Sequence, residues 1–145
     1  MRNLLTVATA TVFATALLTS PAHADPVVHY KVAGTNRCLE DTGTQVVTAP
    51  CAPQDSRQRW LLPIGDDLSD RPRNLGSNRC LTADAAGQVT TTTCTSAANQ
   101  RWRREPRETE FRFRNVAANK CLVAPARVPT LQTCTYQTQR WSAFY

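Results

Sequence analysis

A threefold repeat constrains the fold of this chain more than any other feature of its sequence. Three segments each begin with a cysteine–leucine pair, contain a second cysteine 13 or 14 positions later, and end in the tripeptide Gln-Arg-Trp. The first cysteines of the three segments lie 42 and 41 residues apart. A repeat of this length indicates that each segment encodes one supersecondary unit and that three such units pack together.

The repeat also bears on how the six cysteines pair. Six cysteines allow 15 pairings, and the sequence alone does not discriminate rigorously among them. If the three units fold alike, one local pairing respects the repeat: Cys38–Cys51, Cys80–Cys94 and Cys121–Cys134. Each disulfide would close a loop of about 14 residues and contribute roughly 3 kcal/mol. Zinc is a poor alternative because the chain has no C-x-x-C pair, so we expect no metal and no cofactor.

Each unit is rich in short β-prone runs separated by turn residues. In the first unit these runs cover 29–33, 37–40, 46–49 and 59–64, and about four strands per unit follow. Twelve short strands favour a closed arrangement, because open sheet edges invite aggregation. A propeller needs 4 to 8 blades, so three units favour a threefold barrel instead.

The three Cys-Leu and Gln-x-Trp units resemble the ricin B-type lectin domain, which is a β-trefoil. The resemblance covers nearly all of residues 25–145. It implies an all-β trefoil with pseudo-threefold symmetry, whose lobes would lie at approximately 27–64, 65–106 and 107–145.

The repeated tryptophans are expected to fill the core rather than to stack on sugars. A threefold core needs one large apolar side chain per lobe, and an indole buries about 150 to 250 Å². The glutamine two residues earlier shares the same strand face, so its amide could satisfy turn backbone groups. The expected core set is Leu39, Leu81, Leu122, Gln58, Trp60, Trp102, Gln139 and Trp141.

The resemblance also implies where sugars would bind. Members of the family use an aspartate two residues after the first cysteine, an aromatic residue two before the second cysteine, and an asparagine before the Gln-x-Trp glutamine. In lobe order, the first position holds Glu40, Thr82 and Val123; the second holds Ala49, Thr92 and Gln132; the third holds Arg57, Asn99 and Thr138. No lobe keeps the aromatic residue, and Tyr136 offers only a displaced ring.

The second lobe is the best candidate for a sugar site. Asn99 stands where the amide belongs, and Asp84 lies two residues beyond the acidic position. We expect the third lobe to bind no sugar in the manner of the family. The candidate carbohydrate-binding residues are Asp84, Asn99, Gln100, Glu40 and Asp41.

Basic residues dominate the charge of the chain. The formal net charge is +6, and residues 101–114 contain six arginines and three glutamates. This segment could attract an anionic polymer, or it could be a solvated hairpin face, and we favour the solvated face. The alternation in Phe111–Arg114 predicts a half-buried strand with its arginines outside. The arginines of the segment are Arg101, Arg103, Arg104, Arg107, Arg112 and Arg114.

The N-terminus has the features of a secretory signal peptide. Residues 1–24 carry Arg2, an apolar run over 4–18 and a terminal Ala-His-Ala, and the run is short of the roughly 20 residues that a membrane span needs. We therefore expect an exported mature chain, residues 25–145, without a membrane span.

Catalysis has little support in the mature chain. It would contain one histidine, His29, and no free cysteine if all six pair. We expect a secreted, monomeric, non-enzymatic protein that binds a glycan or polysaccharide. The alternative is a protein-binding or structural trefoil, such as an inhibitor or a toxin-like effector, that has lost its sugar sites.

Overall fold

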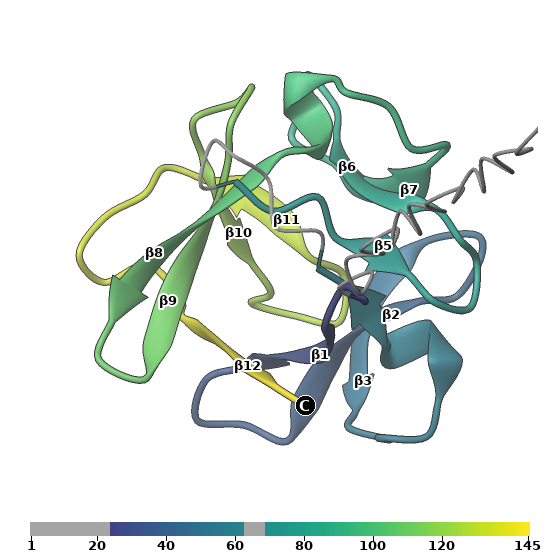
Figure 1. Cartoon of the computed structure of the whole chain (residues 1–145). Helices are drawn as coiled ribbons and strands as arrows, with labels where there is room; N and C mark the ends of the chain where they lie inside the picture. The colour runs from purple at the N-terminus through teal and green to yellow at the C-terminus, as the bar shows by residue number, and fades with distance from the viewer. Residues whose placement is uncertain (1–23, 63–68) are drawn as a thin grey trace, which may run out of the picture.

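The computed structural model describes residues 24–62 and 69–145 (Figure 1). The predicted signal peptide lies almost wholly outside the described residues, as does the end of the predicted strand over 59–64. The described residues form twelve strands and two single-turn 3-10 helices. None of their helices is long and apolar enough to cross a membrane.

Each lobe contributes four strands, the number that the sequence predicts. The first lobe contains β1 (Val27–Val32), β2 (Arg37–Asp41), β3 (Val46–Pro50) and β4 (Trp60–Leu61). The second contains β5 (Arg73–Asn74), β6 (Cys80–Ala83), β7 (Val89–Thr92) and β8 (Trp102–Arg107). The third contains β9 (Glu110–Asn115), β10 (Cys121–Val123), β11 (Thr130–Gln132) and β12 (Trp141–Phe144). The 3-10 turns are η1 (Ser56–Gln58) before β4 and η2 (Ala98–Gln100) before β8.

Six of the strands close into a barrel. Strand β1 pairs with β4 and β12, β4 pairs with β5, and β9 pairs with β8 and β12, all antiparallel. An isolated bridge between Asp70 and Trp102 joins the segment before β5 to β8 and completes the ring. The other six strands form one hairpin per lobe: β2–β3, β6–β7 and β10–β11. This arrangement confirms the predicted all-β trefoil.

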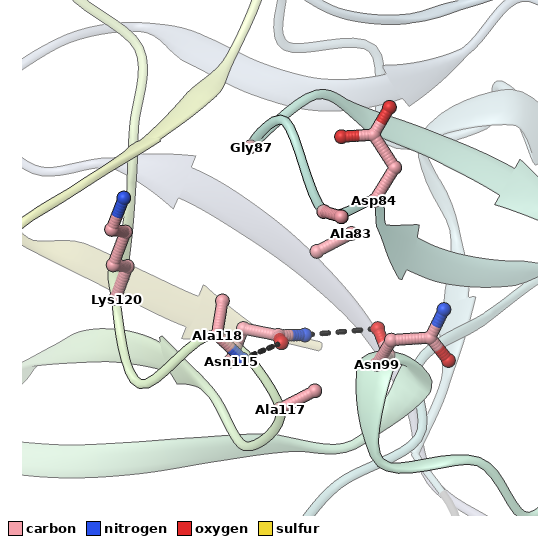
Figure 2. Close-up of a pocket in the computed structure, with 9 residues that line it drawn as sticks. Ala83, Asp84, Gly87, Asn99, Asn115, Ala117, Ala118 and Lys120 are labelled. Carbon is pink, nitrogen blue, oxygen red and sulfur yellow. Dashed lines mark hydrogen bonds between the residues drawn. The ribbon is translucent and has the colours of Figure 1, made fainter.

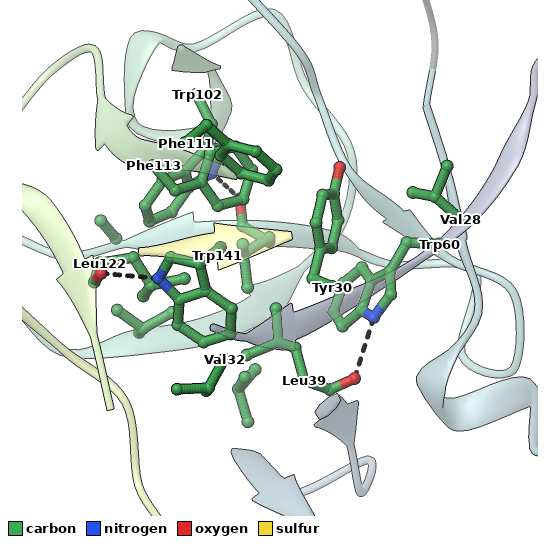
Figure 3. Packing of buried hydrophobic residues seen from close by; sticks show 14 of the residues in the cluster. Val28, Tyr30, Val32, Leu39, Trp60, Trp102, Phe111, Phe113, Leu122 and Trp141 are labelled. Atoms are coloured by element: carbon green, nitrogen blue, oxygen red, sulfur yellow. Dashed lines mark hydrogen bonds between the residues drawn. The ribbon is translucent and has the colours of Figure 1, made fainter. Parts of the chain in front are cut away.

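The three repeated tryptophans occupy the barrel core in the same way (Figure 3). All three indoles are fully buried, and each donates its Nε1–H to the backbone carbonyl of the leucine that follows the first cysteine of its lobe. The distances are 3.1 Å for Trp60 and Leu39, 3.0 Å for Trp102 and Leu81, and 2.9 Å for Trp141 and Leu122. The contact ties the end of each lobe to its first hairpin strand.

The covalent cross-links follow the same threefold rule. The disulfides are Cys38–Cys51, Cys80–Cys94 and Cys121–Cys134, as the repeat predicts, and no cysteine is free. The strand-face prediction for β9 is also confirmed. Phe111 and Phe113 are buried, whereas Arg112 and Arg114 lie on the opposite face and are only partly buried.

Candidate functional site

A hollow of about 470 Å³ lies where the second lobe meets the third (Figure 2). It is bounded by the β6–β7 hairpin, the η2 turn and the turn between β9 and β10. Its polar lining residues are Asp84, Asn99, Asn115 and Lys120. Its apolar lining consists of Ala83, Ala85, Gly87, Ala117 and Ala118. The hollow therefore brings together the two second-lobe residues that the sequence singles out, Asp84 and Asn99.

Asp84 is held by the turn between β6 and β7. Its backbone N–H donates to the Gln88 carbonyl at 2.9 Å, and its Oδ1 accepts the Gln88 backbone N–H at 2.8 Å. Gly87 completes the turn with a φ of +85°, a conformation that a side chain would strain. Oδ2 of Asp84 has no hydrogen-bond partner among the described residues. One carboxylate oxygen thus fixes the side chain and the other remains available on an exposed residue.

Asn99 sits in the middle of the η2 turn, directly before the buried Gln100. Its backbone carbonyl accepts a hydrogen bond from Asn115 Nδ2 at 2.9 Å, drawn as a dashed line in Figure 2. Its side-chain amide makes no hydrogen bond with any described residue. The amide is therefore available to both a donor and an acceptor on a ligand.

Asn115 is a site residue that the sequence analysis missed. Its side chain is fully buried, and its Oδ1 accepts the Ala118 backbone N–H at 3.0 Å. It thereby links η2 to the turn between β9 and β10. Asn74 has the equivalent role behind the first lobe, where its Nδ2 donates to the Arg57 carbonyl at 2.7 Å. Both asparagines lie six residues before a first cysteine, and this spacing could have identified them.

Lys120 lines the hollow, and it stands at a position where the first and second lobes have an arginine. The equivalent residues Arg37 and Arg79 each donate a hydrogen bond to a backbone carbonyl of the next hairpin strand, at Thr48 and Thr91. Lys120 makes no such bond with the described residues and is exposed. Figure 2 shows it across the hollow from Asp84, so the hollow has one acidic and one basic side.

Gln100 was grouped with the carbohydrate-binding candidates, but the structure gives it an internal role. Its side chain is 2% exposed and does not line the hollow. Its Oε1 accepts the Thr95 backbone N–H at 2.7 Å, and its Nε2 donates to the Thr93 carbonyl and the Thr92 hydroxyl, each at 2.8 Å. A third donor contact reaches the Thr82 hydroxyl at 3.1 Å. All of its polar groups are occupied, so Gln100 supports the site from behind.

The two first-lobe candidates, Glu40 and Asp41, are also buried and occupied. Glu40 accepts from Gln58 Nε2 at 2.8 Å and lies 3.5 Å from the guanidinium of Arg57. Asp41 Oδ2 accepts from the Ser77 hydroxyl at 2.5 Å and the Thr91 hydroxyl at 2.8 Å. Asp41 therefore joins the first lobe to the second. Neither residue lines the hollow.

The described residues contain no group of three or more side chains that could hold a metal ion. His29 is buried and stacked on Phe144, with 4.9 Å between ring centroids. Burial and the nearby Arg59 lower the pKa of His29, which keeps the imidazole neutral at neutral pH. The hollow itself presents one carboxylate, one free amide, one ammonium group and a set of methyl groups, which suits hydrogen bonding to a polar ligand.

Solved structures share this fold at low sequence identity. A designed threefold-symmetric protein, ThreeFoil, superposes with a TM-score of 0.74 at 13% identity, covering 82% of this chain and 98% of that one. A Polyporus squamosus lectin bound to a human-type influenza-binding epitope gives 0.71 at 12% identity, covering 83% of this chain and 49% of the lectin. SeviL bound to the asialo-GM1 saccharide gives 0.70 at 10% identity, covering 83% and 97%. At these identities the likeness shows the fold alone.

Sequence comparison places the chain in a family. No curated protein sequence matches it. The profile described as the ricin-type beta-trefoil lectin domain matches residues 25–102, which is more than half of the chain. The chain belongs to the ricin-type β-trefoil lectin domain family.

Proposed function

We propose that this protein is a non-enzymatic carbohydrate-binding module whose working site is the hollow of the second lobe. Membership of a lectin-domain family supports carbohydrate binding in general. The observation that carries the location is the meeting of Asp84 and Asn99 at one hollow, each with hydrogen-bonding capacity left over.

The free groups suit neighbouring hydroxyls of a sugar ring. The open oxygen of Asp84 can accept a hydrogen bond from one hydroxyl, and the Asn99 amide can both donate and accept. A hydrogen bond to a charged group is among the stronger polar contacts. Because the backbones of both residues are fixed, by the Gly87 turn and by Asn115, little conformational entropy is lost on binding.

The apolar side of the hollow differs from the aromatic platform that the family resemblance implies. Thr92 stands at the platform position, and its hydroxyl oxygen accepts a hydrogen bond from Gln100 Nε2. Ala117 and Ala118, contributed by the third lobe, supply methyl groups in place of a ring. A sugar would bury less apolar area on alanine than on an aromatic ring, so we expect weak affinity for a single sugar unit.

We also propose that the protein works outside the cell. The signal-peptide features of residues 1–24 and three disulfides with no free cysteine are both typical of exported proteins. Secretion and proteolytic processing of the full chain, followed by mass spectrometry of the mature N-terminus, would test cleavage after Ala24.

The test of the site compares two matched double variants on a panel of neutral oligosaccharides and insoluble polysaccharides. Asp84→Asn/Asn99→Ala removes the carboxylate and the amide of the hollow. Glu108→Gln/Gln54→Ala removes one exposed carboxylate and one exposed amide that do not line it. We expect the first variant to lose about tenfold or more in affinity and the control to bind like the wild type.

Each outcome of this test decides something. Equal binding by the wild type and the Asp84→Asn/Asn99→Ala variant would show that the sugar site lies elsewhere. Absence of binding to every glycan by the folded wild type would overturn the carbohydrate function and favour a protein-binding trefoil. This alternative rests on the absence of an aromatic residue from the platform position of every lobe; those positions hold Ala49, Thr92 and Gln132.

A further inference from the structure

The outer face of the β8–β9 hairpin carries most of the arginines of the basic segment. Residues of β9 alternate between a buried face and an outer face. On the outer face Arg103 lies opposite Arg114, Glu105 opposite Arg112, and Arg107 opposite Glu110. Figure 1 shows the segment before β12 running beside this hairpin, and Arg112 donates a hydrogen bond to the Thr135 carbonyl at 2.8 Å. The β8–β9 hairpin and the segment before β12, which are distant in sequence, therefore contribute to the same face.

Ion pairs neutralise the centre of this hairpin. Glu105 lies between two arginines: its carboxylate is 2.9 Å from the Arg112 guanidinium and also pairs closely with Arg114. Arg104 pairs with Asp70 at 2.6 Å. These contacts make three arginines of the segment, Arg104, Arg112 and Arg114, structural partners of carboxylates.

Two guanidinium groups lie close to Tyr136 at the tip of the hairpin. Arg107 forms no ion pair with the described residues, and its guanidinium carbon lies 5.6 Å from the centroid of the Tyr136 ring. The guanidinium carbon of Arg140, from the third Gln-Arg-Trp, lies 6.0 Å from the same centroid, and Arg140 also forms a long ion pair of 4.0 Å with Glu110. One aromatic ring is thus flanked by two guanidinium groups.

The ring itself remains accessible. Tyr136 is 74% exposed, although tyrosine in a small domain ordinarily packs against its neighbours. The two guanidinium carbons lie 5.6 and 6.0 Å from the ring centroid, and most of the ring surface stays open to solvent. The cation–π attraction nevertheless restrains the ring at this place, which lowers the entropy cost of using it as a binding platform.

We propose that Arg107, Tyr136 and Arg140 form a second binding site, for a uronate unit of an acidic polysaccharide. The apolar face of a pyranose ring would lie on Tyr136, and its carboxylate would accept hydrogen bonds from the guanidinium of Arg107 or Arg140. The site is separate from the hollow and goes beyond the function proposed for it. Arg107 and Asn115 lie near opposite ends of the β8–β9 hairpin, and a strand the length of β9 spans about 17 Å.

The local pattern of charge favours a uronate over a nucleic acid. Nucleic-acid binding uses an extended track of cations that contacts several phosphates. Here Glu105 and Glu110 interrupt the positive face on both strands, and Arg107, which forms no ion pair with the described residues, lies beside a single ring. A single ring beside one or two guanidinium groups matches one saccharide unit and its carboxylate.

The test uses oligogalacturonate as the probe, with its methyl ester and an oligothymidylate of equal charge as comparisons, at physiological ionic strength. The test variants are Arg107→Gln and Tyr136→Ala, and Tyr136→Phe retains the ring. The matched control is Arg103→Gln, which changes another exposed arginine on the same face of β8, four residues away and about 13 Å along the strand.

We expect the wild type to bind oligogalacturonate and not its methyl ester. Arg107→Gln and Tyr136→Ala should each weaken binding about tenfold, whereas Tyr136→Phe and Arg103→Gln should stay within about twofold of the wild type. The Asp84→Asn/Asn99→Ala variant should bind oligogalacturonate unchanged, which separates this site from the hollow.

Four results would overturn the proposal. Equal weakening by Arg103→Gln and Arg107→Gln would indicate diffuse attraction to the whole face. Tighter binding of oligothymidylate, with the same dependence on Tyr136, would assign the site to nucleic acid. Loss of binding in the Asp84→Asn/Asn99→Ala variant would place the uronate in the hollow, and failure of the wild type to bind oligogalacturonate would remove the site altogether.

Discussion

The second and third lobes share the same scaffold but differ in the side chains that they present at the surface. In both lobes a buried tryptophan bonds to the leucine after the first cysteine, at 3.0 Å and 2.9 Å. On the surface, the second lobe presents a hollow with a free carboxylate and a free amide, whereas the third presents an exposed tyrosine between two arginines. Closing the barrel requires the core residues in every lobe, but it places no such demand on the surface.

The difference extends one layer beneath the surface, to the glutamine of each Gln-Arg-Trp. Gln100 makes hydrogen bonds that hold the end of the β6–β7 hairpin and the loop after it. Gln139 accepts one hydrogen bond, from the Ala124 backbone N–H, and Thr138 takes over the Thr135 backbone N–H through its hydroxyl. The repeated glutamine therefore makes different hydrogen bonds in the two lobes.

The largest expected effect tests whether the two lobes really share one core. Trp102→Ala and Trp141→Ala each remove a fully buried indole, so each should lower the free energy of unfolding by about 3 to 5 kcal/mol. Urea denaturation followed by circular dichroism would measure both. Tyr136→Ala, which truncates an exposed ring, should change stability by about 0.5 kcal/mol or less. A loss confined to one tryptophan would contradict the equivalence of the lobes.

Removing the disulfide of the second lobe, or in a separate variant that of the third lobe, should have the next largest effect. Cys80→Ser/Cys94→Ser and Cys121→Ser/Cys134→Ser open loops that differ in length by one residue, with sequence separations of 14 and 13. Each double variant should lose roughly 3 kcal/mol, and loop-closure entropy predicts a difference between them below about 0.1 kcal/mol. A much larger difference, measured by denaturation, would show that one lobe depends more on its cross-link than the other.

The glutamines should separate the lobes where the tryptophans do not. Gln100→Leu leaves the Thr95 N–H and the Thr93 carbonyl without their partners and should cost about 1 to 3 kcal/mol. Gln139→Leu removes one hydrogen bond from a half-buried side chain and should cost about 1 kcal/mol or less. Equal losses in urea denaturation would mean that the third lobe depends on Gln139 as much as the second depends on Gln100.

The sequence predicted the fold well because the relevant signals are local or repeated. Strand positions follow from short β-prone runs, and the disulfides follow from the threefold spacing of cysteines. Both kinds of signal are present within one unit of about 40 residues and are then reinforced by two further copies.

The site was predicted only in part, because the burial of a polar side chain depends on partners far away in sequence. Asp41 is a carbohydrate-binding candidate in the sequence, yet its buried carboxylate accepts a hydrogen bond from the Thr91 hydroxyl, 50 residues later. One of the two cations beside the Tyr136 ring is Arg107, which lies far from Tyr136 in sequence, where the second lobe ends and the third begins. Pairings of this kind follow from the closure of the barrel, and no repeat within the sequence encodes them.

The smallest expected effect concerns two carboxylates on opposite faces of the β8–β9 hairpin, Asp70 and Glu105. Hydrogen bonds from Arg114, followed by the charges of Arg114 and Arg112, lower the pKa of Glu105 although its partial burial acts against them. Burial raises the pKa of Asp70, and its pair with Arg104 offsets this only in part. The two groups should therefore give stability opposite dependences on pH.

For Glu105, the stabilising contribution is complete above the unfolded pKa of about 4.3 and is lost as the pH falls through the lower folded value. The advantage of the wild type over Glu105→Gln should therefore shrink on acidification. Ionised Asp70 instead destabilises the fold, and this cost grows as the pH rises from about 3.9 toward the higher folded pKa, so the advantage over Asp70→Asn should shrink as the pH rises. Both changes should stay below about 1 kcal/mol, because each carboxylate is paired with an arginine that retains contact with solvent. Urea denaturation of both variants from about pH 3 to about pH 7 would measure the slopes. An advantage of the wild type over Glu105→Gln that grew on acidification would show that the arginines do not stabilise the ionised form of Glu105.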